Sequence, residues 1–334
     1  MIYDTAGVFF IFAGLIQTLT TSAHARLPLA LAQSTRKSYI SMFRVFLAFL
    51  VFAKVEKYQV NVNVLLAFLE CLVVNNIKHS QLLNYLSAIK TISAISGWKI
   101  SDLKHEKVHF YLKSIQKTSP FSVKMHNIID TSLLSDIVAT CSLTYLGDVF
   151  KAVYLTAFFG FFRLSNLVPH TISTFSLMRH LTRGDIFFSQ KFVTILIKWS
   201  KTMQNNNQAR LIKLPLLNNS LCPFLALKRC LQMIPGSKND PLFQFKSGSV
   251  WLPLTDNRVC SHLKNVLSLL NLPPTFITFH SFRRSGATFA FNHNVSLQQI
   301  QRHGAWTSDC VWRYVCDSMD AGSEVASTFA SLLS

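Results

Sequence analysis

Residues 278–315 read TFHSFRRSGATFAFNHNVSLQQIQRHGAWTSDCVWRYV and carry most of the chemistry in the sequence. His280 and Arg283 stand three positions apart, so on a helix both side chains would lie on one face. A second helix is expected to start at Ser296, because Ser296 and Gln299 have the spacing of a capping box. The stretch therefore predicts two consecutive helices, followed by the side chains of His303, Trp306 and Tyr314.

The charge of the chain is strongly one-sided. Its 334 residues include 33 Lys and Arg but only 15 Asp and Glu, which gives a formal net charge of +18. This balance favours a surface that faces a polyanion, with nucleic acid as the first partner to consider and an anionic membrane as the second. Seven scattered cysteines form no CxxC pair, so no zinc site is expected.

The N-terminal part of the chain predicts a small basic helical domain over residues 22–116. A helix is expected from Ser34, with Ser34 as its cap, and others over residues 62–74, 80–96 and 107–114. Basic side chains and helix N-termini of such a bundle can hold DNA phosphates. The candidate DNA-binding residues are Arg36, Lys37, Arg44 and Lys90.

A second domain is expected over residues 127–334, after a break at Ser119-Pro120. Asp130 or Thr131 would cap its first helix, and residues 145–168 read as mostly helical. Arg163 stands there in the apolar segment TAFFGFFRLSNL, where a charge should be paired or functional. Alternating residues at 192–199 and 209–215 predict a β-hairpin with Lys201 in its connection. Beyond Cys222-Pro223 the chain is expected to be mainly helical.

The order of these segments resembles that of the tyrosine recombinases, or phage integrases, and most closely their eukaryotic and mobile-element members. GFFRLSNL is similar to the first arginine box, IKWSKTMQ to the hairpin lysine and HSFRRSGAT to the HxxR box. HGAWTSDCVWRYV is similar to the segment that holds the His-or-Trp position and the nucleophile. The resemblance covers about residues 22–330. It implies a mainly helical fold with a small β-hairpin or sheet, made of a helical, SAM-like core-binding domain and an α+β catalytic domain.

The resemblance also implies an enzyme that breaks and rejoins DNA through a 3′-phosphotyrosyl intermediate, with neither a cofactor nor a metal. Tyr314 would be the nucleophile and His280 its proton acceptor. Two guanidinium groups can fork onto the phosphate oxygens, where negative charge develops in the transition state. These would be Arg163 and Arg283. Lys201 would protonate the leaving 5′ oxygen, and Trp306 would bind the phosphate through its indole N–H.

Two of these positions have alternatives in the sequence. His303 competes with Trp306 for the His-or-Trp position, although the GxW pattern favours Trp306. Lys198 precedes Lys201 by three residues, and the KT context favours Lys201. Bacterial members often have an acidic residue shortly after the first arginine, where this chain has Ser165 and Asn166. Asp185 is a further carboxylate, whose place in the fold the sequence does not predict.

The expected partners are double-stranded DNA and three further copies of the chain, since exchange of two duplexes needs four strand cleavages. A catalytically inactive, domesticated recombinase that only binds DNA is the main alternative, and a type IB topoisomerase is a weaker one. Residues 1–21 form an apolar segment of uncertain status. Residues 6–25 imitate a signal peptide but lack a basic residue before the apolar run, so the similarity is interpreted as fortuitous. We expect an intracellular protein without a membrane partner, nuclear in a eukaryote.

Overall fold

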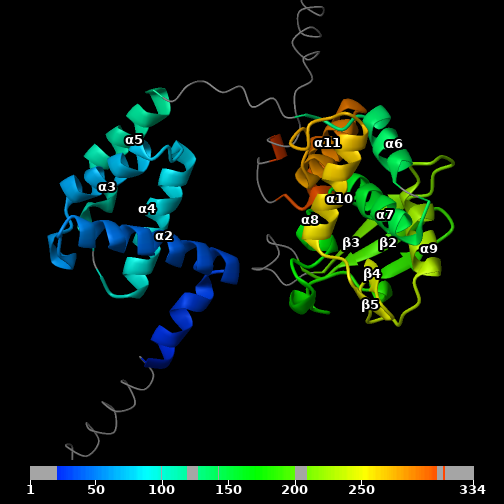
Figure 1. Ribbon diagram of the computed structural model, residues 1–334, viewed down its shortest axis with the longest axis horizontal. Helices are drawn as coiled ribbons and strands as arrows, with labels where there is room; N and C mark the ends of the chain where they lie inside the picture. The colour runs from blue at the N-terminus through cyan, green and yellow to red at the C-terminus, as the bar shows by residue number, and fades with distance from the viewer. Residues whose placement is uncertain are drawn as a thin grey trace, which may run out of the picture. The chain divides into compact units, whose positions relative to one another are not determined.

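The computed structural model describes residues 21–98, 100–118, 127–141, 143–199, 209–306 and 311–312. Two predicted site residues, Lys201 and Tyr314, lie outside the described residues, as does nearly all of the apolar segment 1–21. Contacts divide the chain into two compact units, Met1–Val123 and Lys124–Ser334 (Figure 1).

The first unit is helical. Asn61 caps its second long helix, because the Asn61 side chain accepts hydrogen bonds from the N–H groups of Asn63 and Val64. The predicted cap at Ser34 is wrong, since the first long helix already begins at Gln33. The helices are α2 (Gln33–Phe52), α3 (Val62–Val74), α4 (His79–Ile95) and α5 (Glu106–Thr118), with 3-10 turns at Leu27–Ala30, Lys57–Gln59 and Ser101–Lys104.

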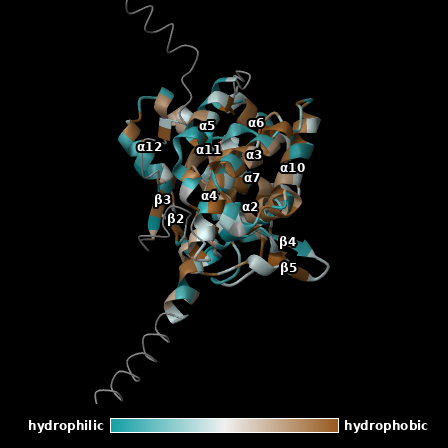
Figure 2. Cartoon of the chain, turned by 90° about the vertical axis from the view of Figure 1, so that its left-hand side faces the viewer, coloured by the Kyte–Doolittle hydropathy of each residue, from teal (hydrophilic) through white to brown (hydrophobic). Residues whose placement is uncertain are grey.

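An aromatic cluster holds this first unit together. Phe46 of α2 is fully buried and contacts Phe68 of α3, with a distance of 5.0 Å between the ring centroids. Trp98, after α4, stacks on Phe46 at 6.0 Å. The helices show both brown and teal along their length in Figure 2, as expected for amphipathic helices with one buried face. The candidate DNA-binding residues lie on the polar sides of α2 and α4: Lys37, Arg44 and Lys90 are exposed and Arg36 is partly buried.

The second unit combines helices with two small antiparallel sheets. The predicted hairpin is confirmed as β2 (Phe192–Ile197) paired with β3 (Arg210–Pro215), and β1 (Ile186–Phe188) adds a strand beside β2. A second hairpin of β4 (Gln244–Ser247) and β5 (Val250–Pro253) was not predicted, but the described chain beyond Pro223 is mainly helical, as expected. The helices are α6 (Thr131–Thr140), α7 (Tyr145–Phe159), α8 (Leu164–Leu167), α9 (Pro223–Met233), α10 (Asp256–Leu269), α11 (Phe279–Asn292) and α12 (Leu297–Gly304).

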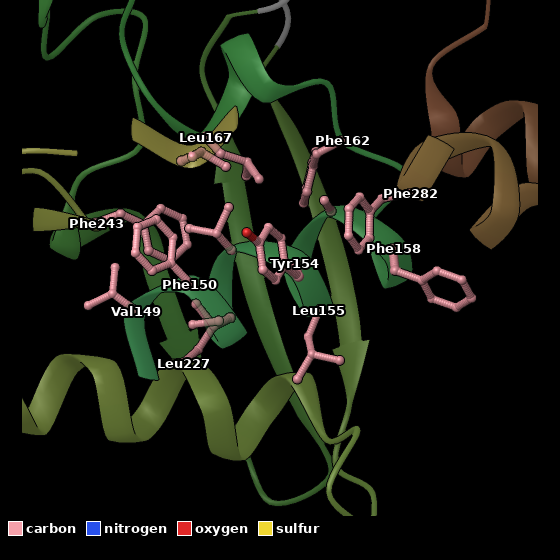
Figure 3. Close-up of a cluster of buried hydrophobic side chains, with 14 of the residues drawn as sticks. Val149, Phe150, Tyr154, Leu155, Phe158, Phe162, Leu167, Leu227, Phe243 and Phe282 are labelled. Carbon is pink, nitrogen blue, oxygen red and sulfur yellow. The ribbon is translucent and has the colours of Figure 1, made fainter. Parts of the chain in front are cut away.

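Helix α7 is the centre of this unit and packs against both α9 and α11. Its fully buried Tyr154 stacks on Phe282 of α11, with ring centroids 5.1 Å apart and ring planes 6° from parallel (Figure 3). A β-carbon on Gly286 of α11 would collide with the carbonyl oxygen of Phe158, so only glycine permits this close approach. The packing therefore fixes α11 against the C-terminal end of α7.

The predicted fold class, mainly helical with a small sheet, is confirmed. Two predicted helix starts are also correct. Asp130 caps α6 by accepting the N–H of Leu133 at 2.8 Å, and Ser296 caps α12 by accepting the N–H of Gln299 at 3.3 Å. In the described part of the chain, no helix is both long and apolar enough to cross a membrane.

Candidate active site

The segment that follows α7 places Arg163. The helix ends at Phe159, and Phe161 adopts a left-handed backbone conformation with φ of 50°. This conformation costs a residue with a side chain about 1–2 kcal/mol. It is held in place by a hydrogen bond, because the carbonyl oxygen of Phe161 accepts from the guanidinium of Arg283. Arg163 follows as the N-cap residue of the short helix α8. The interruption after Phe159 thus brings the two predicted catalytic arginines to the same place.

Arg283 lies in the middle of α11 and is 2% exposed. Besides the bond to Phe161, its guanidinium donates to the carbonyl oxygen of Gly304 at 2.7 Å. It also stacks over the ring of Trp306, with 4.0 Å between the guanidinium carbon and the ring centroid. Arg283 therefore joins the end of α7 to the end of α12.

A small cavity of about 20 Å³ lies between the end of α7, the strands β2 and β3 and the end of α12. A cavity of this size holds about one water-sized group, such as one phosphate oxygen. The described part of its wall includes three arginines, one imidazole and one amide, but no carboxylate. The polar residues in the wall are Arg163, Asn166, Arg210, Arg283 and His303.

His280 lies near the start of α11, three residues before Arg283, as the sequence predicted. It does not line the cavity, but the arginines influence its charge state. Its pKa is lowered to about 4, chiefly by partial burial of the ring. The positive charges of Arg283, Arg163 and Arg284 act in the same direction. At neutral pH the imidazole is therefore uncharged and able to accept a proton.

We expect a pH titration of the free protein, followed by NMR of the histidine side chains, to give His280 a pKa near 4. Removing one positive charge with Arg284→Gln should raise this value. Because the folded-state pKa lies below the ordinary value of 6.5, the contribution of His280 to the free energy of unfolding is complete above pH 6.5 and is lost as the pH falls towards 4. A value of 6.5 or higher in the wild-type protein would contradict the arrangement of charges described above.

His303 and Trp306, the two alternatives for the His-or-Trp position, differ in their surroundings. The Nε2 atom of His303 lies 2.9 Å from the carbonyl oxygen of Phe159, so it must donate a proton there. Burial, with smaller effects from Arg210 and Arg283, lowers the pKa of His303, and the bond to Phe159 opposes this shift. Trp306 is 6% exposed and lies against Arg283. One nitrogen of His303 is thus committed to the backbone, whereas Trp306 supports a predicted phosphate-binding arginine.

The two lysine alternatives also differ. Lys198 forms an ion pair with Asp185, with 2.7 Å between its Nζ and a carboxylate oxygen. The same oxygen of Asp185 accepts the N–H and the hydroxyl of Thr182 at 2.7 and 2.8 Å. Asp185 is therefore the ion-pair partner of Lys198, and the ammonium group of Lys198 is bound to this carboxylate. Lys201 falls in residues 200–208, outside the described part of the hairpin.

Asn166 occupies the region in which bacterial tyrosine recombinases often have an acidic residue. It is 5% exposed and makes two hydrogen bonds of 3.2 Å. Its side-chain oxygen accepts the backbone N–H of Arg163, and its side-chain nitrogen donates to the carbonyl oxygen of Trp199. Asn166 therefore connects the arginine segment to the start of the connection between β2 and β3, a role that was not predicted from the sequence.

Asn166→Asp should weaken this connection, because a carboxylate can accept from Arg163 but cannot donate to Trp199. Leaving a buried carbonyl without its donor costs about 1–3 kcal/mol, so we expect a lower free energy of unfolding in urea. Ser165→Asp is the matched control, since it adds the same charge at an exposed neighbouring position. Equal free energies of unfolding for the two variants would show that the hydrogen bond from the Asn166 amide to Trp199 does not contribute to stability.

Of the predicted site residues that are described, Arg163, Arg283 and His303 line one cavity, and His280 and Trp306 lie next to it through their interactions with Arg283. Asn166 and Arg210 line the same cavity and were not predicted. Among the described residues, no group of three or more His, Cys, Asp or Glu side chains is placed to hold a metal ion.

The chain matches no protein-family model, and no curated protein matches it by sequence. Several solved structures are similar in fold. The integrase of the transposon Tn1549, in complex with transposon right-end DNA, is 11% identical with a TM-score of 0.62, over 92% of this chain and 99% of that one. The XerH site-specific recombinase in its post-cleavage complex with difH DNA is 16% identical with a TM-score of 0.57, over 81% and 71%.

A third similar structure is a lambda integrase dimer bound to a COC′ core site, at 15% identity and a TM-score of 0.53, over 89% of this chain and 77% of that one. These three structures cover both units of the chain, and all are recombinases or integrases. The protein therefore has the tyrosine recombinase fold.

Proposed function

We propose that the protein is a site-specific DNA recombinase or integrase, descended from a mobile element, that breaks and rejoins DNA through a 3′-phosphotyrosyl intermediate. One observation carries this proposal. Arg163 and Arg283, which are 120 positions apart in the sequence, line the same small cavity in a fold shared with DNA-bound recombinases. Two guanidinium groups at one point suit the stabilisation of a phosphate in its transition state.

In the proposed reaction the phenol oxygen of Tyr314 attacks the scissile phosphorus, and the bond from phosphorus to the 5′ oxygen breaks. His280, uncharged at neutral pH, accepts the phenol proton. Lys201 gives a proton to the departing 5′ oxygen. The new phosphotyrosyl bond conserves the energy of the broken phosphodiester, so the reverse attack by a 5′ hydroxyl rejoins the strand.

The arginines would stabilise the extra negative charge on the nonbridging oxygens during attack. Arg283 is well prepared for this task, because two backbone carbonyls and the ring of Trp306 hold its guanidinium in one orientation. A charge partner that is already oriented loses little energy to reorganisation in the transition state. We assign the His-or-Trp position to Trp306, where its indole N–H would bind the phosphate, and we keep His303 as the alternative.

We further propose that the two units are a core-binding domain and a catalytic domain, with boundaries near residues 22–116 and 127–334. The first would hold DNA phosphates with Arg36, Lys37, Arg44 and Lys90. The net charge of +18 supports a DNA partner. Exchange of two duplexes requires four cleavages, so four copies would act together on two synapsed sites. Such a protein would work where the cell keeps its DNA, in the nucleus of a eukaryote.

A covalent-adduct assay tests this function. The protein is incubated with a nicked duplex that was selected from a random-sequence pool by its affinity for the protein, and the products are separated on a denaturing gel. The nick lets the cleaved fragment diffuse away and traps the phosphotyrosyl bond. A recombinase gives a DNA adduct, whereas an inactive DNA-binding protein gives none. Relaxation of supercoiled plasmid without dependence on the selected site would favour a topoisomerase instead.

A further inference from the structure

Arg210 is the first residue of β3 and lies opposite Ile197, the last residue of β2. Side chains alternate along this strand. Ile212 and Leu214 face the core and are buried, whereas Leu211 and Lys213 are exposed. Arg210 belongs to the inward-facing set, and this register brings it to the wall of the cavity that Arg163 and Arg283 also line.

The guanidinium of Arg210 has no partner of its own in the described part of the chain. The ion pairs there involve the carboxylates of Asp148, Asp185 and Asp256, and none of them reaches Arg210. Its side chain also makes no hydrogen bond with the described residues. A partly buried charge without a partner is costly, so such a group is expected to have an anionic ligand.

The described wall of the cavity as a whole also has more positive than negative side chains. Three arginines, Arg163, Arg210 and Arg283, line it, and none of the described residues in its wall is acidic. Partial burial lowers the pKa of Arg210, as expected for a cation that has lost water without gaining a carboxylate. Three like charges around a space for one water-sized group repel one another until an anion binds between them.

We propose that Arg210 is a third phosphate-binding arginine of the cleavage site, which contacts a nonbridging oxygen of the scissile phosphate together with Arg163 and Arg283. This inference rests on the proposed recombinase function. A phosphodiester carries one negative charge and its pentavalent transition state carries more. A third guanidinium at the same oxygens would therefore contribute mainly to the rate of cleavage.

The test compares two substrates. One is the selected nicked duplex, and the other is the same duplex with an uncharged methylphosphonate in place of the scissile phosphate. Arg210→Gln should slow adduct formation on the phosphodiester by about 100-fold, the effect of removing one oriented donor from a charged transition state. On the methylphosphonate, which lacks the charge that Arg210 neutralises, the two proteins should differ by no more than about threefold.

Lys213→Gln is the matched control. It removes one positive charge from the same strand at an exposed position that faces away from the cavity. It should leave both rates unchanged to within about twofold. An equal defect of Arg210→Gln on both substrates, or no defect on either, would overturn the proposed contact.

A binding measurement separates failure of this contact from failure of the proposed function. Affinity for a 30-base-pair random-sequence duplex is measured against salt concentration. Loss of one phosphate contact lowers the slope of log affinity against log salt by about one, whether or not cleavage occurs. If wild-type protein forms no adduct, the proposed enzyme activity is wrong. An unchanged slope in Arg210→Gln would then overturn the phosphate contact as well, and a reduced slope in that variant alone would support it.

Discussion

Arg283→Ala should reduce the rate of adduct formation about 1000-fold, which is the largest effect expected from a single described residue. The substitution removes the guanidinium that the phosphate would contact. It also removes the donors of the hydrogen bonds to the carbonyls of Phe161 and Gly304. Two buried acceptors without donors cost roughly 2–6 kcal/mol, so the free energy of unfolding should fall as well. Urea denaturation measures the second effect, and single-turnover adduct formation at a temperature where the variant is folded measures the first.

Two further variants separate the chemical role of Arg283 from its structural one. Arg283→Lys keeps the charge but lacks the planar fork, so it should recover part of the stability and little of the cleavage rate. Arg302→Ala removes an exposed arginine from the neighbouring helix α12 and should leave both quantities unchanged. Cleavage by a folded Arg283→Ala protein at more than about one tenth of the wild-type rate would show that this guanidinium is not at the reacting phosphate.

Tyr314→Phe should abolish the adduct and keep the affinity for DNA to within about twofold, because only the nucleophilic oxygen is lost. The adduct is measured on a denaturing gel and the affinity by fluorescence anisotropy. Tyr145→Phe is the matched control, since its hydroxyl accepts a hydrogen bond from the backbone of Lys246 and takes no part in the proposed chemistry. An adduct of normal yield from the Tyr314→Phe protein would exclude this residue as the nucleophile.

Local patterns predicted most of the helices of this protein. Asp130 and Ser296 cap helices as expected, since a capping side chain bonds to backbone only two or three positions away. The β2–β3 hairpin followed from alternating residues around a polar connection. His280 and Arg283 share α11 because the whole motif lies within one helix. In each case the deciding contacts are local in the sequence.

The features that were missed depend on short elements or distant contacts. Strand β1 has only three residues, too few to show an alternating pattern. The β4–β5 hairpin turns at Gly248, whose φ of 59° is typical of a tight hairpin turn, but its strands have four residues each. The importance of Arg210 depends on the strand register that places it opposite Ile197. That of Asn166 depends on the carbonyl of Trp199, 33 positions away.

The proximity of the two proposed catalytic arginines could be seen only in the folded structure. Arg163 could be selected from the sequence because it is a charged residue in an apolar segment. Its proximity to Arg283 could not be predicted from the sequence. In the structure, Phe161 connects the two arginines. It lies two residues before Arg163, has a left-handed backbone conformation, and its carbonyl oxygen accepts a hydrogen bond from Arg283. The resemblance predicted which residues belong together, and the packing of α11 on α7 explains how they meet.

Mass-spectrometric mapping of the trapped adduct tests the central claim most directly. The adduct is digested with trypsin and nuclease, and the peptide that carries the remaining nucleotide is sequenced. Tyr314 is the only tyrosine between Arg302 and Ser334, so a single modified peptide from this region identifies it. We predict one nucleotide, joined through its 3′ phosphate to the phenol oxygen of Tyr314. A nucleotide on any other residue, or one joined through a 5′ phosphate, would contradict the proposed mechanism.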